Sequence, residues 1–218
     1  ENVNSIYKIG SPDVDVMLSD NLPEIEDAKN RYDIKFDNFS IAILHPVTTE
    51  VENMKKQAEV FVESLIESNK NYILIYPNND KGTEHILNAY NKLKNLKNFK
   101  IFPSIRFEYF LTLLKYSDFI IGNSSTGIHE APIYGVPTID LGTRQNNRFN
   151  YESIINIDFE KEKIINQMKV VVSKKRYTPT NHYGKGNSAE LFLNVMKKSK
   201  VWNTKYQKKF FDIKSDYV

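Results

Sequence analysis

The sequence contains no cysteine among its 218 residues, which excludes disulfide bonds and thiolate metal sites. An absence of cysteine is typical of a reducing compartment, and we expect a cytoplasmic location. No apolar run approaches the roughly 18 residues of a membrane span, and no charged-then-apolar leader opens the sequence. We therefore expect no contact with a membrane.

A large excess of one charge is also missing, since 30 Lys and Arg face 27 Asp and Glu, leaving a net charge of +3. This excess is too small to predict a nucleic-acid partner. Four histidines without any cysteine give no spacing typical of a metal site. We expect no metal and no cofactor. A hydrophobic content of 40% is nevertheless enough for a folded core.

Short apolar runs alternate with amphipathic segments along most of the chain. The runs predict buried strands, and the segments between them have the 3.6-residue period of helices. Strands are expected at 39–44, 72–76, 99–102, 119–121, 138–141 and 153–157. Helices are expected at 50–69, 83–93, 107–116, 128–134, 159–174 and 187–199. This alternation predicts an α/β fold with a doubly wound, parallel, Rossmann-like sheet of about six strands.

The two ends of the chain show a weaker pattern. Residues 7–9 predict a short strand, a helix is expected from 13 to about 22, and 24–37 predict a surface connection. In a doubly wound sheet, the residues that follow the strands lie along one edge. We expect this edge to collect His45, Asn78, Ser104, Asn123 and Gly142.

A hydroxyl-rich turn lies between the fourth predicted strand and the next helix. It reads Asn-Ser-Ser-Thr-Gly at 123–127. Small residues let a ligand approach the backbone, serine hydroxyls donate hydrogen bonds, and helix-start N–H groups attract anions. An ordinary N-cap is the competing interpretation. The later Glu130, Arg144 and Arg148 favour a phosphorylated ligand that carries hydroxyl groups.

The run GNSSTGIHEAPIYGVPTIDLGTRQNNR at 122–148 resembles the UDP-binding segment of the hydrolysing UDP-N-acetylglucosamine 2-epimerases of sialic acid biosynthesis. Supporting motifs are HPVTT at 45–49, YPNND at 76–80 and YGKGN at 183–187. Non-hydrolysing relatives carry a basic HRREN-like motif in place of HPVTT, so this departure favours the hydrolysing branch. The resemblance covers nearly all of the chain except its last stretch.

The resemblance implies the C-terminal half of a glycosyltransferase-B-type fold. It implies an interdomain segment at 1–23, a UDP-binding domain at 24–200 and a tail at 201–218. An upstream N-terminal domain, expected before Glu1, would supply the acidic catalytic residues, and the full-length enzyme would be a homo-oligomer. The family reaction eliminates UDP from UDP-N-acetylglucosamine and hydrates the glycal to N-acetylmannosamine. This chain alone is expected to bind UDP weakly and to be inactive.

The resemblance also assigns site residues, each with a plainer alternative. His45 is the catalytic candidate, although it could be an ordinary loop residue. The predicted UDP-binding residues are Asn78, Asp80, Ile105, Phe110, Ser124, Ser125, Gly127, Glu130 and Arg144. Among these, Asn78 and Asp80 are common turn residues, Phe110 suits a helix core, and Arg144 suits a surface ion pair.

Three other functions are consistent with the same motifs. They are a hydrolysing epimerase of UDP-2,4-diacetamido sugars, a glycosyltransferase donor-binding domain, and a non-catalytic UDP-sugar binding module. The spacing of the YGKGN motif does not match a P-loop.

Overall fold

The computed structural model describes residues 5–174, 176–203 and 207. The chain divides into two compact units, one of residues 20–182 and one that combines residues 1–19 with 183–218. The predicted tail at 201–218 lies mostly outside the described residues. No helix in the described part of the chain is long and apolar enough to cross a membrane.

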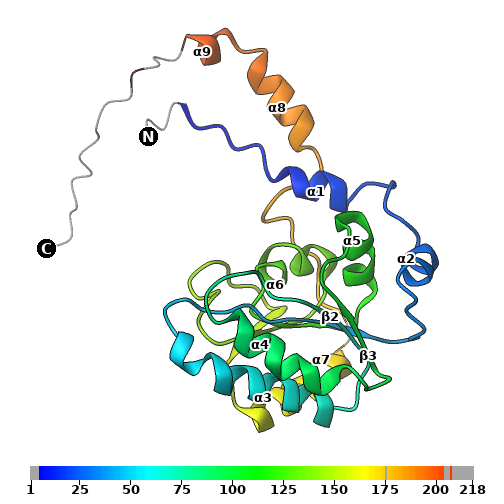
Figure 1. The fold of residues 1–218 in the computed structure, drawn as a ribbon. Helices are drawn as coiled ribbons and strands as arrows, with labels where there is room; N and C mark the ends of the chain where they lie inside the picture. The colour runs from blue at the N-terminus through cyan, green and yellow to red at the C-terminus, as the bar shows by residue number, and fades with distance from the viewer. Residues whose placement is uncertain (1–4, 175, 204–206, 208–218) are drawn as a thin grey trace, which may run out of the picture. The chain divides into compact units, whose positions relative to one another are not determined.

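The larger unit contains a six-stranded sheet in the order β3-β2-β1-β4-β5-β6 (Figure 1). All five strand pairs are parallel, which confirms the predicted doubly wound, Rossmann-like α/β class. The strands are β1 Ser40–Ile43, β2 Tyr72–Ile75, β3 Phe99–Phe102, β4 Ile120–Gly122, β5 Thr138–Leu141 and β6 Ile154–Ile157.

The helical segments of this unit follow the predicted alternation. They are α2 Ile25–Arg31, η2 Val51–Asn53, α3 Met54–Glu67, α4 Thr83–Tyr90, η3 Asn91–Leu93, α5 Phe107–Tyr116, α6 Thr126–His129, η4 Ala131–Tyr134 and α7 Lys161–Lys174. One face of the sheet packs against α3, α4 and α7, and the other against α2, α5 and η4 (Figure 1).

Two apolar clusters fill these two faces, and β1 contributes to both. Ala42 and Leu44 belong to the cluster under α3, whereas Ile41 and Ile43 belong to the cluster under α5. Successive strand side chains point to opposite faces, so a strand buried on both sides is mostly apolar along its length. A fully buried leucine or isoleucine side chain contributes about 1.5–3 kcal/mol.

Two local predictions in the larger unit were wrong. Residues 24–37 include helix α2, of which only Ala28 is buried, so its apolar period is too short to detect. The helix expected at 128–134 is split into α6 and η4. Pro132 lacks the N–H that a continuous helix needs at this point. Gly135 then ends η4 with φ +65, and a Cβ there would lie 2.2 Å from the carbonyl oxygen of Tyr177.

The smaller unit joins the two ends of the chain through α1 Pro12–Met17, α8 Ser188–Met196 and α9 Ser199–Trp202. The Asp15 carboxylate accepts from the amides of Ser188 and Ala189, both at 2.9 Å, and from the Ser188 hydroxyl at 2.8 Å. These amides lower the pKa of Asp15. Asp15 thus caps α8 from another helix. The strand predicted at 7–9 is absent from this described segment, and the helix predicted from 13 to about 22 ends at Met17.

Candidate functional site

Strands β1 and β4 are neighbours from which the chain leaves in opposite directions. From β1 it crosses to β2 and β3, and from β4 it crosses to β5 and β6. Ligands of open α/β sheets bind at such a switch point, because the diverging loops leave a crevice beyond the carboxyl ends of the strands. His45 follows β1 and Asn123 follows β4, so the predicted site lies at this point.

Asn123 joins the ends of these two strands. Its side chain is fully buried, accepts from the His45 amide at 2.7 Å and donates to the His45 carbonyl at 2.8 Å. The Asn123 carbonyl accepts from Arg144 Nη1 at 3.0 Å and from Gln145 Nε2 at 2.8 Å. One asparagine therefore joins residues that lie 21, 22 and 78 positions from it in the sequence. The sequence placed Asn123 in the turn but did not predict this role.

His45 has a defined protonation state. Its Nδ1 accepts a hydrogen bond from the Asn78 amide at 3.1 Å, so the neutral ring carries its hydrogen on Nε2. Burial and the nearby Arg144 lower the pKa of His45 to about 4, although Asp80 opposes them. Near neutral pH the ring is therefore an uncharged hydrogen-bond donor. A catalytic role for His45 stays a prediction.

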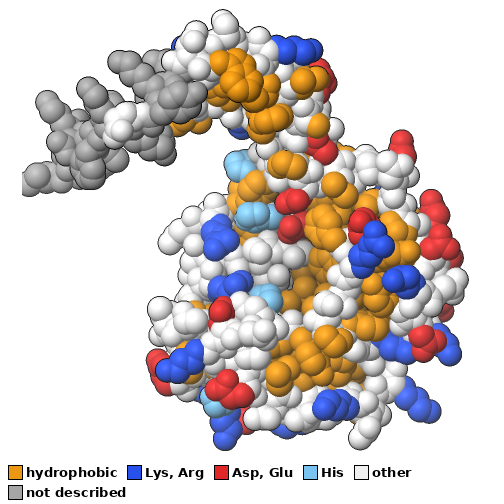
Figure 2. Space-filling model, turned by 45° about the horizontal axis from the view of Figure 1, so that its top comes forward, with side chains coloured by type: hydrophobic (Ala, Val, Ile, Leu, Met, Phe, Trp, Pro, Cys, Tyr) orange, Lys and Arg blue, Asp and Glu red, His pale blue; other side chains and the backbone are white. Residues whose placement is uncertain are grey.

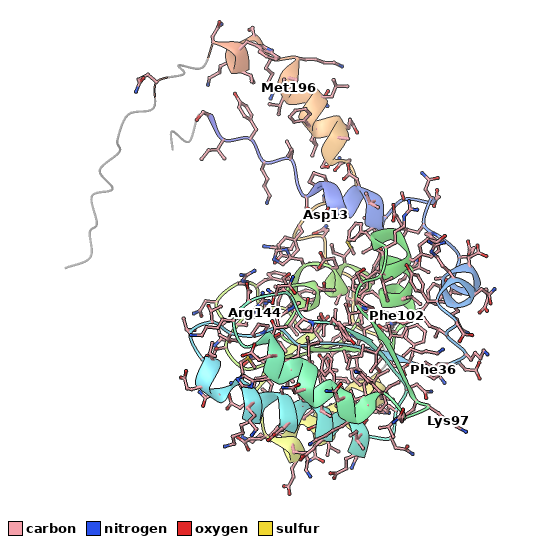
Figure 3. The ribbon with its side chains drawn as sticks, in the orientation of Figure 1. Asp13, Phe36, Lys97, Phe102, Arg144 and Met196 are labelled. Atoms are coloured by element: carbon pink, nitrogen blue, oxygen red, sulfur yellow. The ribbon has the colours of Figure 1, made fainter. Side chains whose placement is uncertain are left out.

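Arg144 supplies the positive charge at this edge. It follows β5 and is partly buried. In Figure 3 it lies at the opposite end of the sheet from Lys97, which precedes β3. Burial and Arg148 lower the pKa of Arg144, while Asp80 and Asp140 raise it. A guanidinium remains charged under all ordinary conditions. Its hydrogen bond to Asn123 fixes the cation beside the hydroxyl-rich turn.

Asn78 and Asp80 shape the loop after β2. Asn78 Nδ2 donates to Asp80 Oδ2 at 2.5 Å, and the Thr83 hydroxyl contacts the carbonyl oxygens of both residues at 2.6 Å. These contacts show that Asn78 and Asp80 form the turn that leads into α4. The Oδ1 of Asn78 and the Oε1 of Gln145 are buried and have no hydrogen-bond donor among the described residues. Unmatched buried acceptors at one edge indicate a ligand or water that supplies donors.

The hydroxyl-rich turn is held against β5. Ser124 Oγ accepts from the Thr126 amide at 3.3 Å, whereas no acceptor for the Ser124 and Ser125 amides is found among the described residues. A Cβ on Gly127 would lie 2.5 Å from Thr138 Cγ2, and the Thr138 hydroxyl donates to the Gly127 carbonyl at 2.7 Å. Gly127 therefore permits close packing of the turn on β5. Diphosphate contact by these residues stays a prediction.

Glu130 lies at the junction between α6 and η4, partly buried and about one turn after Ser125. Burial, and then the charge of Glu130, raise the pKa of Tyr134. The position agrees with the predicted distance from the turn. Ribose recognition by Glu130 stays a prediction.

Ile105 lies in the loop that follows β3, and Phe110 lies in α5. Phe110 is 9% exposed and belongs to the apolar cluster under α5, and Ile105 packs against that cluster. Tyr32 and Phe102 form an edge-to-face pair nearby, with ring centres 5.4 Å apart. Figure 2 shows hydrophobic side chains beside histidine and cationic side chains on one face of the larger unit. Uracil contact by Ile105 and Phe110 stays a prediction.

The described residues contain no group of three or more His, Asp or Glu side chains able to hold a metal ion. The motif at 183–187 belongs to the smaller unit, where the Ser11 amide donates to the Tyr183 carbonyl at 2.7 Å.

Comparison with known proteins finds the same fold in solved structures and matches the chain to one protein family. The sequence model of a family described as UDP-N-acetylglucosamine 2-epimerase matches residues 1–197. The chain is 45% identical to a UDP-N-acetylglucosamine 2-epimerase of Neisseria meningitidis, over 98% of this chain and 57% of that protein. It is 28% identical to the polysialic acid biosynthesis protein P7 of Escherichia coli, over 98% of this chain and 56% of that protein. The chain thus spans a little over half the length of these relatives.

A further relative and the solved structures are more distant. A UDP-N,N'-diacetylbacillosamine 2-epimerase (hydrolyzing) of Legionella pneumophila is 26% identical, over 90% of this chain and 52% of that protein. The UDP-GlcNAc 2-epimerase of Methanocaldococcus jannaschii was solved with UDP-GlcNAc and UDP. It matches with a TM-score of 0.70 at 24% identity, over 90% of this chain and 56% of that chain. The ADP-heptose heptosyltransferase II of Escherichia coli has a TM-score of 0.53 at 12% identity, over 72% and 53%. At these identities, the structural likenesses establish the fold.

Proposed function

Because the chain belongs to the UDP-N-acetylglucosamine 2-epimerase family, we propose that its larger unit holds the UDP part of a UDP-sugar within a longer enzyme. In this proposal Ser124, Ser125 and Arg144 bind the diphosphate, and Glu130 binds the ribose hydroxyls. Ile105 and Phe110 flank the uracil. A further domain supplies the acidic catalytic residues, which is consistent with the 57% coverage of the Neisseria relative.

The observation that carries this proposal is the hydrogen-bonded junction at the switch point. Asn123 holds both His45 and Arg144 through contacts of 2.7 to 3.0 Å. The Asn78 amide holds the His45 ring through Nδ1 at 3.1 Å, so a cation and a neutral N–H donor are fixed before a ligand arrives. Fixed dipoles and charges stabilise charge that develops in a transition state, because they need no reorganisation during the reaction. Departure of a diphosphate from a sugar develops such charge.

We place the full-length enzyme in the hydrolysing branch. The reaction would break the bond between the sugar C1 and the diphosphate oxygen, with loss of the C2 proton, giving UDP and a glycal. Addition of water to the glycal then gives N-acetylmannosamine. This proposal is supported by HPVTT at 45–49 and by similarity to the E. coli polysialic acid biosynthesis protein P7.

A second candidate is hydrolytic epimerisation of a UDP-2,4-diacetamido sugar, favoured by similarity to the Legionella enzyme. Both candidates share the UDP contacts and differ in the sugar. Incubating the full-length enzyme separately with each UDP-sugar and identifying the released sugar distinguishes them. Transfer of the sugar to an acceptor would instead indicate a glycosyltransferase, and binding without turnover would indicate a non-catalytic module.

The nucleotide site is tested by Glu130→Gln, which keeps the size of the side chain and removes its charge. Charge-assisted hydrogen bonds to ribose hydroxyls contribute roughly 1.5–3 kcal/mol each. UDP affinity measured by calorimetry should therefore fall about tenfold or more. Pyrophosphate has no ribose, so its affinity should hardly change.

A matched control is Glu63→Gln on α3, whose exposed carboxylate pairs with Lys92 at 3.7 Å. This control should leave binding of both ligands unchanged. Equal changes in UDP and pyrophosphate affinity for Glu130→Gln would remove Glu130 from ribose recognition. Failure of the unsubstituted chain to bind UDP would refute the nucleotide site.

A further inference from the structure

Asp140 is a buried carboxylate beside the site that no motif singled out. It lies in β5, is 3% exposed, and pairs in register with Gly122 on one side and Asn156 on the other. Asn156 Nδ2 donates to Asp140 Oδ2 at 2.8 Å and also to the Gly142 carbonyl at 2.8 Å. Buried carboxylates normally have cationic partners or several donors. Asp140 has one neutral donor among the described residues.

Arg144 provides the nearby positive charge. It stabilises the ionised form of Asp140, and Asp140 in turn stabilises the charged form of Arg144. The hydrogen bond of Arg144, however, goes to the Asn123 carbonyl within the proposed diphosphate site. One guanidinium therefore serves both the buried carboxylate and the ligand site.

The other elements packed on β5 bring little charge toward Asp140. The paired positions of β4 and β6 are the uncharged Gly122 and Asn156. Helix α6 packs through Gly127, and its titratable side chain, His129, is exposed. The buried residues of α7 are apolar, namely Ile164, Met168 and Val171. Arg144 thus dominates the electrostatic environment of Asp140.

We infer that Asp140 is a proton-accepting positioning residue, ionised near Arg144 in the free protein and protonated when a diphosphate engages Arg144. The inference rests on the proposed function. The bound diphosphate adds negative charge and satisfies the cation, so the ionised carboxylate becomes unfavourable. One proton from solvent then converts the carboxylate to a carboxylic acid, and its carbonyl oxygen still accepts from Asn156.

The free protein has the property that this linkage requires. Burial raises the pKa of Asp140 to about 6, while Asn156 and Arg144 lower it. A ligand that raises this pKa further binds with proton uptake. Affinity should be constant below about pH 6, and should fall by up to about tenfold per pH unit above it until the pKa of the complex is reached. His45, whose pKa is about 4, does not titrate in this window.

The test uses UDP-N-acetylglucosamine, because its diphosphate is esterified at both ends and lacks the terminal phosphate group whose second pKa is near 6. Calorimetry at about pH 6, 7 and 8, in buffers of different ionisation enthalpy, measures affinity and proton uptake. The unsubstituted chain should take up a proton, and Asp140→Asn should bind without uptake or pH dependence. The matched control is Asp118→Asn, which removes a half-buried carboxyl near Lys70 and Arg176 before β4 and should retain the pH dependence.

The outcomes separate the inference from the proposed function. An equal pH slope for Asp140→Asn and the unsubstituted chain overturns the inference and leaves UDP-sugar binding intact. Absence of binding at every pH refutes the proposed function and the inference together. Carbon NMR titration of the Asp140 carboxyl needs no variant. A pKa that rises when UDP-N-acetylglucosamine is added supports the inference, and an unchanged pKa overturns it.

Discussion

Replacing Asn123 by alanine should both destabilise the larger unit and weaken nucleotide binding. The substitution removes the two hydrogen bonds, of 2.7 and 2.8 Å, that join the Asn123 side chain to the His45 backbone. Each bond contributes about 0.5–1.5 kcal/mol, and a buried backbone group left without a partner costs about 1–3 kcal/mol. We therefore expect a loss of about 2–4 kcal/mol, or roughly 4–16 °C in melting temperature.

The same substitution should move the groups that the proposed site uses. The His45 backbone loses these two contacts, and the turn that presents the Asn123 carbonyl to Arg144 loosens. Loss of one ligand hydrogen bond of about 1.4 kcal/mol corresponds to a tenfold fall in UDP affinity. Urea unfolding and calorimetry with UDP measure the two effects on the same preparation.

Asn71→Ala is the matched control for Asn123→Ala. Asn71 precedes β2 at the opposite edge of the sheet, and its Nδ2 donates to the Asn38 carbonyl at 3.0 Å in an exposed contact. This variant should lose less than about 1 kcal/mol and keep full UDP affinity. If Asn123→Ala and Asn71→Ala differ by less than about 0.5 kcal/mol, or bind UDP equally well, the bridging role of Asn123 is wrong.

Two further predictions concern single side chains. Gly127→Ala should lower the free energy of unfolding by about 1–3 kcal/mol, because the new methyl overpacks against the Thr138 methyl. Adding Thr138→Ser, which removes that methyl and keeps the hydroxyl, should restore most of the urea midpoint. No recovery in the double variant would contradict this cause. The fold lowers the pKa of His45 from 6.5 to about 4, so between these pH values the ring is protonated in the unfolded chain but neutral in the folded one. The free energy of unfolding should therefore be unaffected by His45 above about pH 6.5, and should fall by up to about 1.4 kcal/mol per pH unit from there toward pH 4. Unfolding midpoints should show this slope in the unsubstituted chain but not in His45→Asn, and nitrogen NMR should show the hydrogen on Nε2.

The strands and most helices were predictable from local pattern. β3 and α5 were predicted at 99–102 and 107–116, where the structure places them. The strands are short, mostly apolar runs between polar segments, so their limits appear directly in the sequence. The alternation of strands and helices then implied one edge for the loops, which also predicted that His45, Asn78 and Asn123 come together.

The tertiary structure alone decided how these residues interact. Asn123 reaches His45 across 78 positions, and Asp15 caps α8 across 173. Such partners depend on how the chain closes on itself, so no local period encodes them. Burial likewise decides ionisation: Asp140 and His45 are ordinary titratable residues in the sequence, and their pKa values are set by the surroundings that the fold assembles.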